Sequence, residues 1–581
     1  MGKKPVKGDT TTKMWVKIVC GIMGFLMVFG VLIMLISSLQ TAAVESTDSL
    51  TVPDQQINVG LYCNENAVQS YALSSEHGFQ VTVAPSGPAI SLDAPKMIVA
   101  VDDNLYRMGS ELSTTSGGIA TVGGYHIEIS YFTFSDLGID TDHDNPVFIR
   151  PGSTAGSTDG YSPANVYEYI SLLSDDTTFQ ALALPAFPCY VSSQKCYIRV
   201  GNFFTKEEAE DALAQLQRTM TLNASIAEPN ANAVTMLSED YTVLCEFTGK
   251  NQSYQVTPLE DGLMRGADGR AFSGTVSMEN SANSSRKGID VINQLSLETY
   301  ISVLLPSEVS SEWNVELLKS MAVLLRTEIT RKLGCHAADG YDICAESHCH
   351  TYIGGAVATD RVLDAVQATA GQILTYNGAP VYTPYSLTNG SGTISAKDAF
   401  GKEIPYLPSI YTPWEEQSSW SVEFTPFELY QLLSNAGYRE ITGNIASVKV
   451  NALAEGSDYV TSVTFTDLFG GSVTIEGSET IRLLFSGRLP SSCFVVGLAG
   501  ESVERIKRTL SGNTTEYTES QETVVLSGTY GSFVFMGSGS GCGVGFSVMG
   551  AKALAERELG YRQILSTYFP GAELSDSGSS E

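Results

Sequence analysis

Three cysteines and three histidines lie within the segment CHAADGYDICAESHCH, at 335–350. The whole chain has only six histidines, so half of them lie in this short stretch. Thiolate and imidazole are the ligands that tetrahedral Zn²⁺ prefers in proteins. Outside the cytoplasm, a disulfide among Cys335, Cys344 and Cys349 is the alternative. The segment therefore predicts a zinc site, with a disulfide-bonded loop as the second interpretation.

The overall charge excludes one large class of partner. The 581-residue chain carries 64 Asp and Glu against 34 Lys and Arg, a formal net charge of −30. Such a chain repels phosphate backbones, so we expect no binding of nucleic acid. Hydrophobic residues make up 43% and charged residues 17%, which excludes a mostly disordered chain.

The N-terminal residues predict a membrane anchor. Residues 1–17 hold five lysines against one aspartate, and residues 18–36 carry no charge. A helix over 18–36 spans about 28 Å, close to the hydrocarbon thickness of a bilayer. Basic residues precede the segment, so the positive-inside rule places the N-terminus in the cytoplasm and the bulk of the chain outside the cell membrane. A cleaved signal peptide ending near Ala42 and Ala43 is the alternative.

The exported part predicts a multidomain α+β fold, with mixed sheets and short helices behind a single transmembrane helix. The predicted divisions are a cytoplasmic arm at 1–17, a transmembrane helix at 18–39, a linker at 40–56, an N-terminal α/β region at 57–255, a larger domain at 260–575 with inserted strands at about 415–525, and a disordered tail at 576–581.

A phrase of the form Ile-x-Val-Gly-x-aromatic occurs twice in the N-terminal region. It predicts a strand, a polar turn and a helix over 57–71, and again over 198–217. In the second copy Ala209, Leu213 and Leu216 form one apolar helical stripe. This copy resembles the SPOR domain, a small sheet-and-helix module that binds peptidoglycan glycan lacking stem peptides. A generic αβ unit is the alternative.

Apolar periodicity predicts three helices in the larger domain, at about 315–333, 360–370 and 550–559. Gly334 follows the first of them and is typical of a helix end. The second leads into a strand at 372–378, which ends in an Asn-Gly turn. An apolar run that precedes Pro306 predicts a further strand, directly before Glu308.

Three long phrases in this domain resemble, in order and spacing, the stage II sporulation protein D (SpoIID) family, of which a related branch is the amidase enhancers. They are LSLETYISVLLPSEVSSEWNVELLKSMAVLLRTEI at 295–329, AVQATAGQILTYNGAPVYTPYSLTNGSG followed by FGKEIPYLPS within 365–409, and GSGSGCGVGFSVMGAKALAERELGYRQILSTYFPGAEL at 537–574. The resemblance implies a peptidoglycan lytic transglycosylase. Such an enzyme cleaves between N-acetylmuramic acid and N-acetylglucosamine, prefers strands stripped of peptides, and leaves a 1,6-anhydro end.

That reaction needs one carboxyl group, whereas ordinary glycosidases need two. The acid protonates the leaving oxygen, and its carboxylate then takes the proton of the attacking C6 hydroxyl of the sugar itself. Glu308 matches the family's Pro-x-Glu, and we expect its apolar neighbours to raise its pKa. Arg326 matches the family's Ala-x-Ala-x-Arg-Thr and would orient substrate or Glu308. A structural ion pair is the alternative for Arg326.

The family resemblance also implies a ligand set for the zinc site. The family's His-Cys pair matches His348 and Cys349, and its preceding cysteine matches Cys344. His336 is the expected fourth ligand, with Cys335 and His350 as rivals. The implied reaction does not itself require a metal, and we expect no organic cofactor.

The third phrase departs from the family in a way that affects the expected substrate wall. The family's Gly-His-Gly-Val-Gly-Met-Ser-Gln appears as a segment in which Cys542 replaces the His and Val548 replaces the Gln. The glycines remain, and they let backbone approach a sugar closely. The expected substrate-binding residues are Asn389, Ser391, Gly541, Cys542, Gly543 and Ser547.

The expected partners are peptidoglycan glycan strands, the cell membrane through the N-terminal helix, and a wall amidase that supplies peptide-free glycan during engulfment in sporulation. A non-catalytic peptidoglycan-binding scaffold or amidase enhancer is the alternative function. The changes at Cys542 and Val548 favour the scaffold, and the retained Glu308 and Arg326 favour the enzyme.

Overall fold

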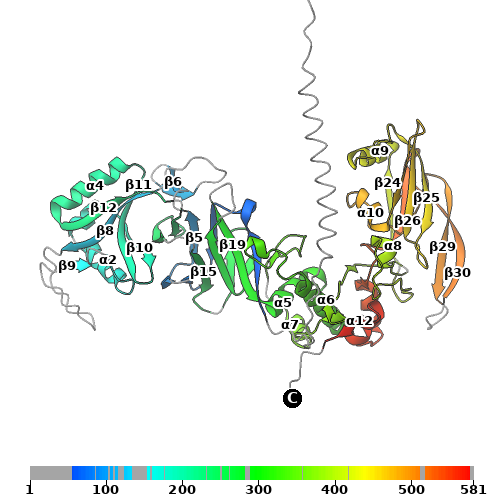
Figure 1. The fold of residues 1–581 in the computed structure, drawn as a ribbon, viewed down its shortest axis with the longest axis horizontal. Helices are drawn as coiled ribbons and strands as arrows, with labels where there is room; N and C mark the ends of the chain where they lie inside the picture. The colour runs from blue at the N-terminus through cyan, green and yellow to red at the C-terminus, as the bar shows by residue number, and fades with distance from the viewer. Residues whose placement is uncertain are drawn as a thin grey trace, which may run out of the picture. The chain divides into compact units, whose positions relative to one another are not determined.

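The computed structural model describes residues 55–575, with several internal gaps. The gaps are residues 85–86, 102–104, 109–110, 115–123, 134–153, 157–159, 176, 231, 249–251, 261, 282–287, 356–357, 391, 417 and 511–516. The predicted arm, membrane span and tail lie outside the described residues. Within the described ranges, no helix has the length and apolar character needed to cross a bilayer. The mixed α+β fold is confirmed, with several sheets and short helices (Figure 1).

Two large sheets occupy the first part of the described chain. The eleven-stranded sheet has the order β12 (Thr221–Ala227), β8 (Tyr125–Thr133), β11 (Lys195–Phe203), β10 (Ala186–Ser192), β14 (Val243–Phe247), β13 (Val234–Leu237), β5 (Lys96–Val101), β2 (Ser70–Ser74), β16 (Met264–Gly266) and β17 (Ala271–Phe272), with β9 (Thr154–Gly156) beside β8. The seven-stranded sheet has the order β20 (Ile343–Cys344), β1 (Gln56–Tyr62), β19 (Ile289–Ser296), β18 (Thr275–Asn280), β15 (Ser253–Pro258), β3 (Phe79–Ala84) and β4 (Ala89–Leu92).

The sheets follow from side-chain alternation. In β3, Phe79, Val81 and Val83 are buried and alternate with more exposed polar residues, as expected for a strand with one face in the core. A separate hairpin joins β6 (Leu105–Met108) to β7 (Glu111–Thr114).

The predicted boundary at 255–260 falls within one sheet. Strand β1 pairs antiparallel with β19 along its length, with Ile57 opposite Leu295. It also pairs parallel with β20, where Gly60 lies opposite Cys344. The first described strand of the chain is therefore a direct neighbour of the cysteine–histidine segment.

The two copies of the Ile-x-Val-Gly phrase have different structures. The second forms strand β11 and helix α4 (Lys206–Thr219), which begins with a capping box between Thr205 and Glu208, so the predicted strand–turn–helix is confirmed. In the first copy the predicted helix is wrong. A short turn at η1 (Asn64–Asn66) leads into strand β2, because Tyr71 and Leu73 are buried at a spacing of two and pair with β5.

Helices α2 (Val166–Asp175) and α4 pack on the eleven-stranded sheet, and α3 (Thr177–Leu182) follows α2.

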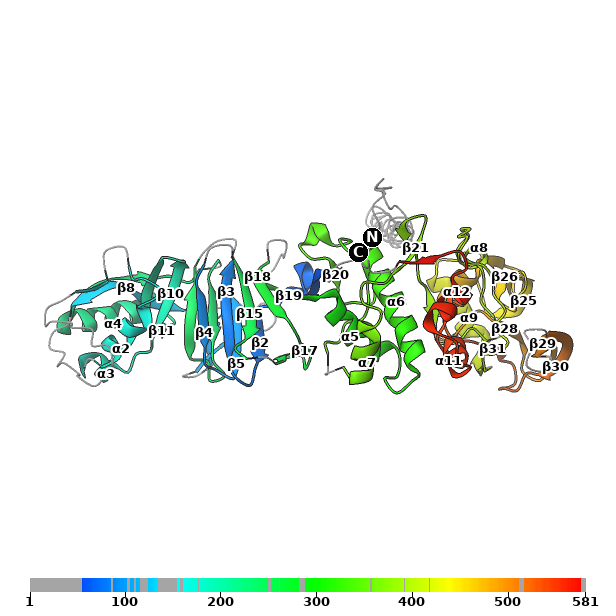
Figure 2. The same ribbon diagram turned by 90° about the horizontal axis from the view of Figure 1, so that it is seen from below.

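Three helices form the centre of the larger domain. They are α5 (Leu297–Glu308), α6 (Val315–Lys332) and α7 (Asp360–Gln367), which contact one another and lie together in Figure 2. The prediction of α6 is confirmed almost to the residue, and that of α7 apart from its last turn. The strand predicted before Glu308 is wrong. Ser296 caps a helix instead, and Pro306 is tolerated in its last turn.

Short strands and helices complete this domain. The predicted Asn-Gly turn is confirmed, with positive φ at Asn377 and Gly378, and it joins two antiparallel strands. The remaining elements are β21 (Leu374–Tyr376), β22 (Ala379–Pro380), β23 (Tyr385–Ser386), α8 (Ala396–Phe400), β32 (Phe546–Ser547), α11 (Val548–Glu556), α12 (Tyr561–Tyr568) and β33 (Glu573–Leu574). Helix α11 starts two residues before its predicted position, and α12 was not predicted.

The inserted segment has a hydrophobic core of its own, around Phe424, Phe485 and Phe535. Its strands are β24 (Ser419–Phe424), β25 (Ile445–Leu453), β26 (Val460–Asp467), β27 (Ser472–Glu476), β28 (Phe494–Leu498), β29 (Ser502–Leu510), β30 (Tyr517–Val525) and β31 (Phe533–Ser538), and its helices are α9 (Pro426–Asn435) and α10 (Ser478–Leu484). Strands were predicted over about 415–525, whereas β31 lies beyond that range and the two short helices were not predicted.

An ion cluster around the fully buried Glu246 lies within the eleven-stranded sheet. The Glu246 carboxylate accepts a hydrogen bond from Arg199 at 2.6 Å and lies 3.0 Å from His126 Nε2. Arg199 also pairs with Glu128 at 2.9 Å. Burial alone would raise the pKa of Glu246, but the charges of His126 and Arg199 outweigh it and hold that pKa below its usual range.

We expect Glu246→Gln to destabilise this sheet by about 3 kcal/mol, because it removes the buried carboxylate that His126 and Arg199 share and leaves Arg199 with Glu128 alone. A carboxyl whose folded-state pKa is lowered stabilises the fold above its unfolded pKa of about 4.3. That stabilisation is lost as the pH falls below this value, and the variant should lack this part of the acid sensitivity.

Amide hydrogen exchange of β8, β11 and β14 at pH 7 and pH 3.5 measures both effects. Glu228→Gln is the control, because Glu228 forms an exposed pair with Lys206. Equal exchange in the Glu246 and Glu228 variants would contradict the prediction.

Candidate active site and cysteine–histidine cluster

Glu308 is the last residue of α5, and its carboxylate opens into a pocket of about 320 Å³. Tyr385, on the short strand β23, donates a hydrogen bond of 2.7 Å to Glu308 Oε2. His350 Nδ1 lies 3.8 Å from the other carboxylate oxygen. The side chain of Glu308 keeps 23% of its surface exposed, so the carboxylate is held in place but accessible.

The pKa of Glu308 differs from the sequence prediction. Burial would raise this pKa, but hydrogen bonds from His350 and Tyr385, together with the charge of His350, lower it below its usual value. The expectation that apolar neighbours raise the pKa is therefore wrong, because polar partners from distant segments outweigh them. Burial raises the pKa of Tyr385, so its phenol stays protonated and remains a donor.

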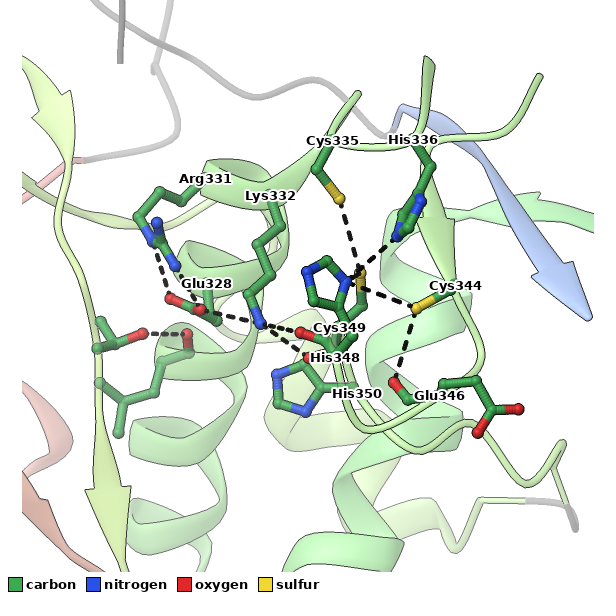
Figure 3. Close-up of polar contacts among 12 residues, drawn as sticks. Glu328, Arg331, Lys332, Cys335, His336, Cys344, Glu346, His348, Cys349 and His350 are labelled. Carbon is green, nitrogen blue, oxygen red and sulfur yellow. Dashed lines mark hydrogen bonds and ion pairs between the residues drawn. The ribbon is translucent and has the colours of Figure 1, made fainter. Parts of the chain in front are cut away.

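A second carboxylate, Glu328 of α6, lines the same pocket but is fully engaged. Arg331 donates two hydrogen bonds to it, at 2.7 and 3.0 Å, and Lys332 Nζ lies 3.3 Å away. Figure 3 shows Lys332 extending from the end of α6 toward the next loop, where it donates to the backbone oxygens of His348 and Cys349 at 3.0 Å each. Lys332 thus joins a pocket carboxylate to the cysteine–histidine segment.

The structure does not bring Arg326 to Glu308. Its guanidinium is completely buried and forms a bidentate pair with Glu298, at 2.8 and 2.6 Å. It also donates to the backbone oxygen of Gln372 at 3.2 Å. This is the structural ion pair that was the alternative for Arg326, and it ties α5 to α6 and to the chain after α7.

The second phrase supplies two expected substrate residues, Asn389 and Ser391, and the structure describes the first of them. Asn389 is fully buried, and its backbone N–H donates to Glu415 at 2.7 Å. Ser391 is outside the described residues. Glu415 also accepts hydrogen bonds from Thr388 and Thr412. Burial raises the pKa of Glu415, against the effect of these hydrogen bonds.

Residues of the third phrase also contact the buried carboxylate of Glu415. Ser547 is fully buried, caps α11 through Gly550 N–H, and contributes a further hydrogen bond to Glu415. Strands β23 and β32 pair in parallel, with Tyr385 opposite Phe546. Glu415 therefore binds both the segment that carries β23 and the segment that carries β32. The pairing of these two strands places Tyr385 beside Glu308.

Of the glycine-rich residues, Cys542 is the one that lines the Glu308 pocket. Burial raises the pKa of its thiol, and its Sγ lies 3.9 Å from Ser386 Oγ. Gly541 and Gly543 have φ of 127° and 77°, and a Cβ at either position would overlap Ser386 or Tyr459. These glycines therefore let the loop pack closely against the protein.

The donor atoms of the cysteine–histidine cluster are spaced as metal ligands. His336 Nε2 lies 3.3 Å from His348 Nδ1, which is 3.5 Å from Cys349 Sγ, and Cys349 Sγ is 3.6 Å from Cys335 Sγ. Tetrahedral zinc with its usual bond lengths places ligand atoms about 3.3–3.8 Å apart. In addition, His336 Nδ1 lies 3.2 Å from the Asp339 carboxylate, a common outer partner of a metal-bound imidazole.

The closest group of donor atoms contains Cys335, a rival in the sequence analysis, in place of the expected ligand Cys344. Cys335, His336, His348 and Cys349 have ligand atoms all within 4.8 Å of one another. Cys344 is more peripheral, with its Sγ 3.8 Å from His348 Nδ1. His350 is not part of this group, and its Nδ1 lies 3.8 Å from the Glu308 carboxylate. None of the nine described cysteines forms a disulfide.

The sheet holds this cluster in place. Cys344 lies on β20 beside β1, and the Asp342 carboxylate accepts hydrogen bonds from the backbone and side chain of Asn58, at 2.8 and 3.1 Å. Sequence reasoning missed Tyr385, Lys332 and Glu415. The only available signal was the position of Tyr385 within the second family-like phrase.

Part of this chain is similar to a known protein family. Residues 285–376 match a family model described as SpoIID, stage II sporulation protein. Residues 285–376 form a SpoIID domain. They contain Glu308, Arg326 and the whole cysteine–histidine cluster, whereas Tyr385 and Cys542 lie beyond the matched residues.

Three relatives extend the match over about half of this chain. An uncharacterised protein of Brachyspira hyodysenteriae is 27% identical over 296 residues, covering 49% of this chain and 68% of the relative. The amidase enhancer of Bacillus subtilis is 25% identical over 47% of this chain and 39% of its own length. Stage II sporulation protein D of the same organism is 23% identical over 49% of this chain and 76% of its own. The predicted relation to the SpoIID and amidase-enhancer family is confirmed, and the SPOR-like assignment stays a prediction.

We expect Tyr385→Phe to raise the pKa of Glu308, because it removes a hydrogen bond that favours the ionised carboxylate. Carbon-13 NMR titration of the side-chain carboxyls measures this pKa, with Glu308→Gln identifying the signal. Tyr382→Phe is the matched control, since Tyr382 lines the same pocket. The prediction fails if the two tyrosine variants have the same Glu308 titration.

Proposed function

We propose that this protein is a membrane-anchored lytic transglycosylase that cleaves peptide-free peptidoglycan strands between N-acetylmuramic acid and N-acetylglucosamine. The N-terminal anchor would place the described domains outside the cell membrane. The names of two relatives, amidase enhancer and stage II sporulation protein D, support a role in sporulation beside a wall amidase.

The observation that carries the proposal is a pocket with one carboxylate left for chemistry. Glu308 and Glu328 both line it, but Glu328 is neutralised by Arg331 and Lys332. Ordinary glycosidases need two carboxyl groups on either side of the bond. A transglycosylase that uses the substrate's own hydroxyl needs only one, which is what Glu308 provides.

In the proposed reaction, Glu308 first donates its proton to the oxygen between the two sugars, and the bond from this oxygen to C1 of the muramic acid breaks. The C6 hydroxyl of the same sugar then attacks C1, forming the anhydro bond, and the Glu308 carboxylate takes the hydroxyl proton. The acid is thereby regenerated without water.

The lowered pKa of Glu308 fits the second half of this cycle, in which it acts as a base. The first half needs the protonated form. A glycan that covers the exposed part of the carboxylate would raise its pKa by desolvation, so that substrate binding favours proton uptake. Tyr385 then holds one oxygen and leaves the other for the glycosidic bond.

Glu308→Gln should abolish release of products from amidase-treated glycan strands, because an amide cannot donate and retrieve the proton. Mass spectrometry should show wild-type products that are lighter by one water than hydrolysis products. Glu312→Gln is the control, since Glu312 is an exposed acid in the turn that follows Glu308. Products with the mass of added water, or equal activity in the Glu308 variant, would overturn the proposal.

One observation favours a second function. The pocket presents a half-buried thiol at Cys542, with a raised pKa, and this thiol offers weaker hydrogen bonds to a sugar than an imidazole does. A protein that still binds strands and cleaves none would act as a wall-binding scaffold or amidase enhancer. The same digestion assay, with strand binding measured in parallel, separates the two functions.

We also propose that the cluster holds Zn²⁺. Cys335, His336, His348 and Cys349 would provide two thiolates and two imidazoles, the usual composition of a structural zinc site. Bound zinc would supply a fixed tetrahedral geometry. The loop that carries these ligands also carries His350, so the site would fix the partner of Glu308.

The purified chain should contain one zinc ion, and Cys335→Ser and Cys349→Ser should each remove most of it, because each deletes a thiolate of the tight group. Cys344→Ser should retain more zinc than Cys335→Ser. Elemental analysis measures the content, and Cys63→Ser is the control, a half-buried cysteine outside the group. Full zinc content after Cys349→Ser would contradict this ligand set.

A further inference from the structure

A second and larger cavity, of about 630 Å³, lies in the inserted segment. One wall is apolar and includes Val450, Leu453 and Phe494, from strands β25 and β28. The hairpin of β29 and β30 closes another side. The cavity lies outside the matched SpoIID residues and takes no part in the chemistry proposed for Glu308.

The glycine-rich loop connects this cavity to the Glu308 pocket. Gly537 and Ser538 line the larger cavity, and Cys542 lines the pocket. The loop between them is anchored, since Gly539 N–H donates to Ser418 and Ser540 N–H donates to the Thr388 oxygen. Even when fully extended, the few residues from 538 to 542 cover only about 14 Å.

The chemistry of the larger cavity suits an amino sugar. Its polar side offers Ser418, Asp458 and Ser538, which can hydrogen-bond to sugar hydroxyls and amides. The apolar wall suits the acetyl methyl group and the ring face.

We infer that this cavity is a distal subsite for the same peptide-free glycan strand, with uncleaved sugars in the larger cavity while the scissile bond lies at Glu308. This inference rests on the proposed function for its ligand. It adds that the inserted segment selects long strands over short fragments, because only a long strand reaches both cavities along the 537–543 loop.

The test is binding by the full chain in detergent micelles, in a Glu308→Gln background that prevents cleavage. The probes are a peptide-free disaccharide, which is too short to reach both cavities, and long peptide-free strands from amidase-treated peptidoglycan. Leu453→Asp removes an apolar contact and introduces a charge at the cavity rim, where Leu453 is 46% exposed. Leu468→Asp is the matched control, since Leu468 is 67% exposed and does not line the cavity.

Leu453→Asp should weaken binding of long strands about tenfold relative to Leu468→Asp and leave disaccharide binding unchanged. Any contribution of the N-terminal region to long-strand binding is common to both variants and cancels. Equal long-strand affinities of the two variants, or equal losses for both probes in Leu453→Asp, would overturn the inference. Failure of catalysis in the wild type is a separate result, because it leaves this binding difference measurable.

Discussion

The hydrogen bond between Tyr385 and Glu308 is the constraint around which the candidate site is built. It joins the end of α5 to a two-residue strand 77 positions later in the chain. Tyr385 reaches Glu308 because β23 pairs with β32 and because the buried carboxylate of Glu415 binds the segments on both sides of that pairing. This bond also contributes to the low pKa of Glu308, so the geometry and the proton affinity of the site share one cause.

The pocket and the cysteine–histidine cluster are coupled through a single loop. Lys332 binds the backbone oxygens of His348 and Cys349 while it faces Glu328 in the pocket wall. The next residue, His350, faces Glu308. A metal held by the cluster would therefore stiffen the pocket without entering the reaction. Strand β1 supports the same loop from the other side, through β20.

Local patterns predicted the elements that local forces stabilise. Helix α6 has a long apolar face and Gly334 just beyond its end, and its predicted bounds are confirmed. The capping box at Thr205 likewise fixed the start of α4. The predictions failed where sheet pairing or a cap decided between two conformations. Residues after η1 pair with β5 as strand β2, and the apolar run before Glu308 forms a helix capped by Ser296.

The sequence by itself determined which residues carry the chemistry: an acid at Glu308, a dense group of cysteines and histidines, and the family whose phrases contain them. Only the tertiary structure decided their partners. It buried Arg326 against Glu298, brought Tyr385 to Glu308, and placed Cys335 ahead of Cys344 in the cluster. Residue type and spacing encode which groups can react, but their electrostatic environment is set by side chains from distant segments, whose positions depend on packing of the whole domain.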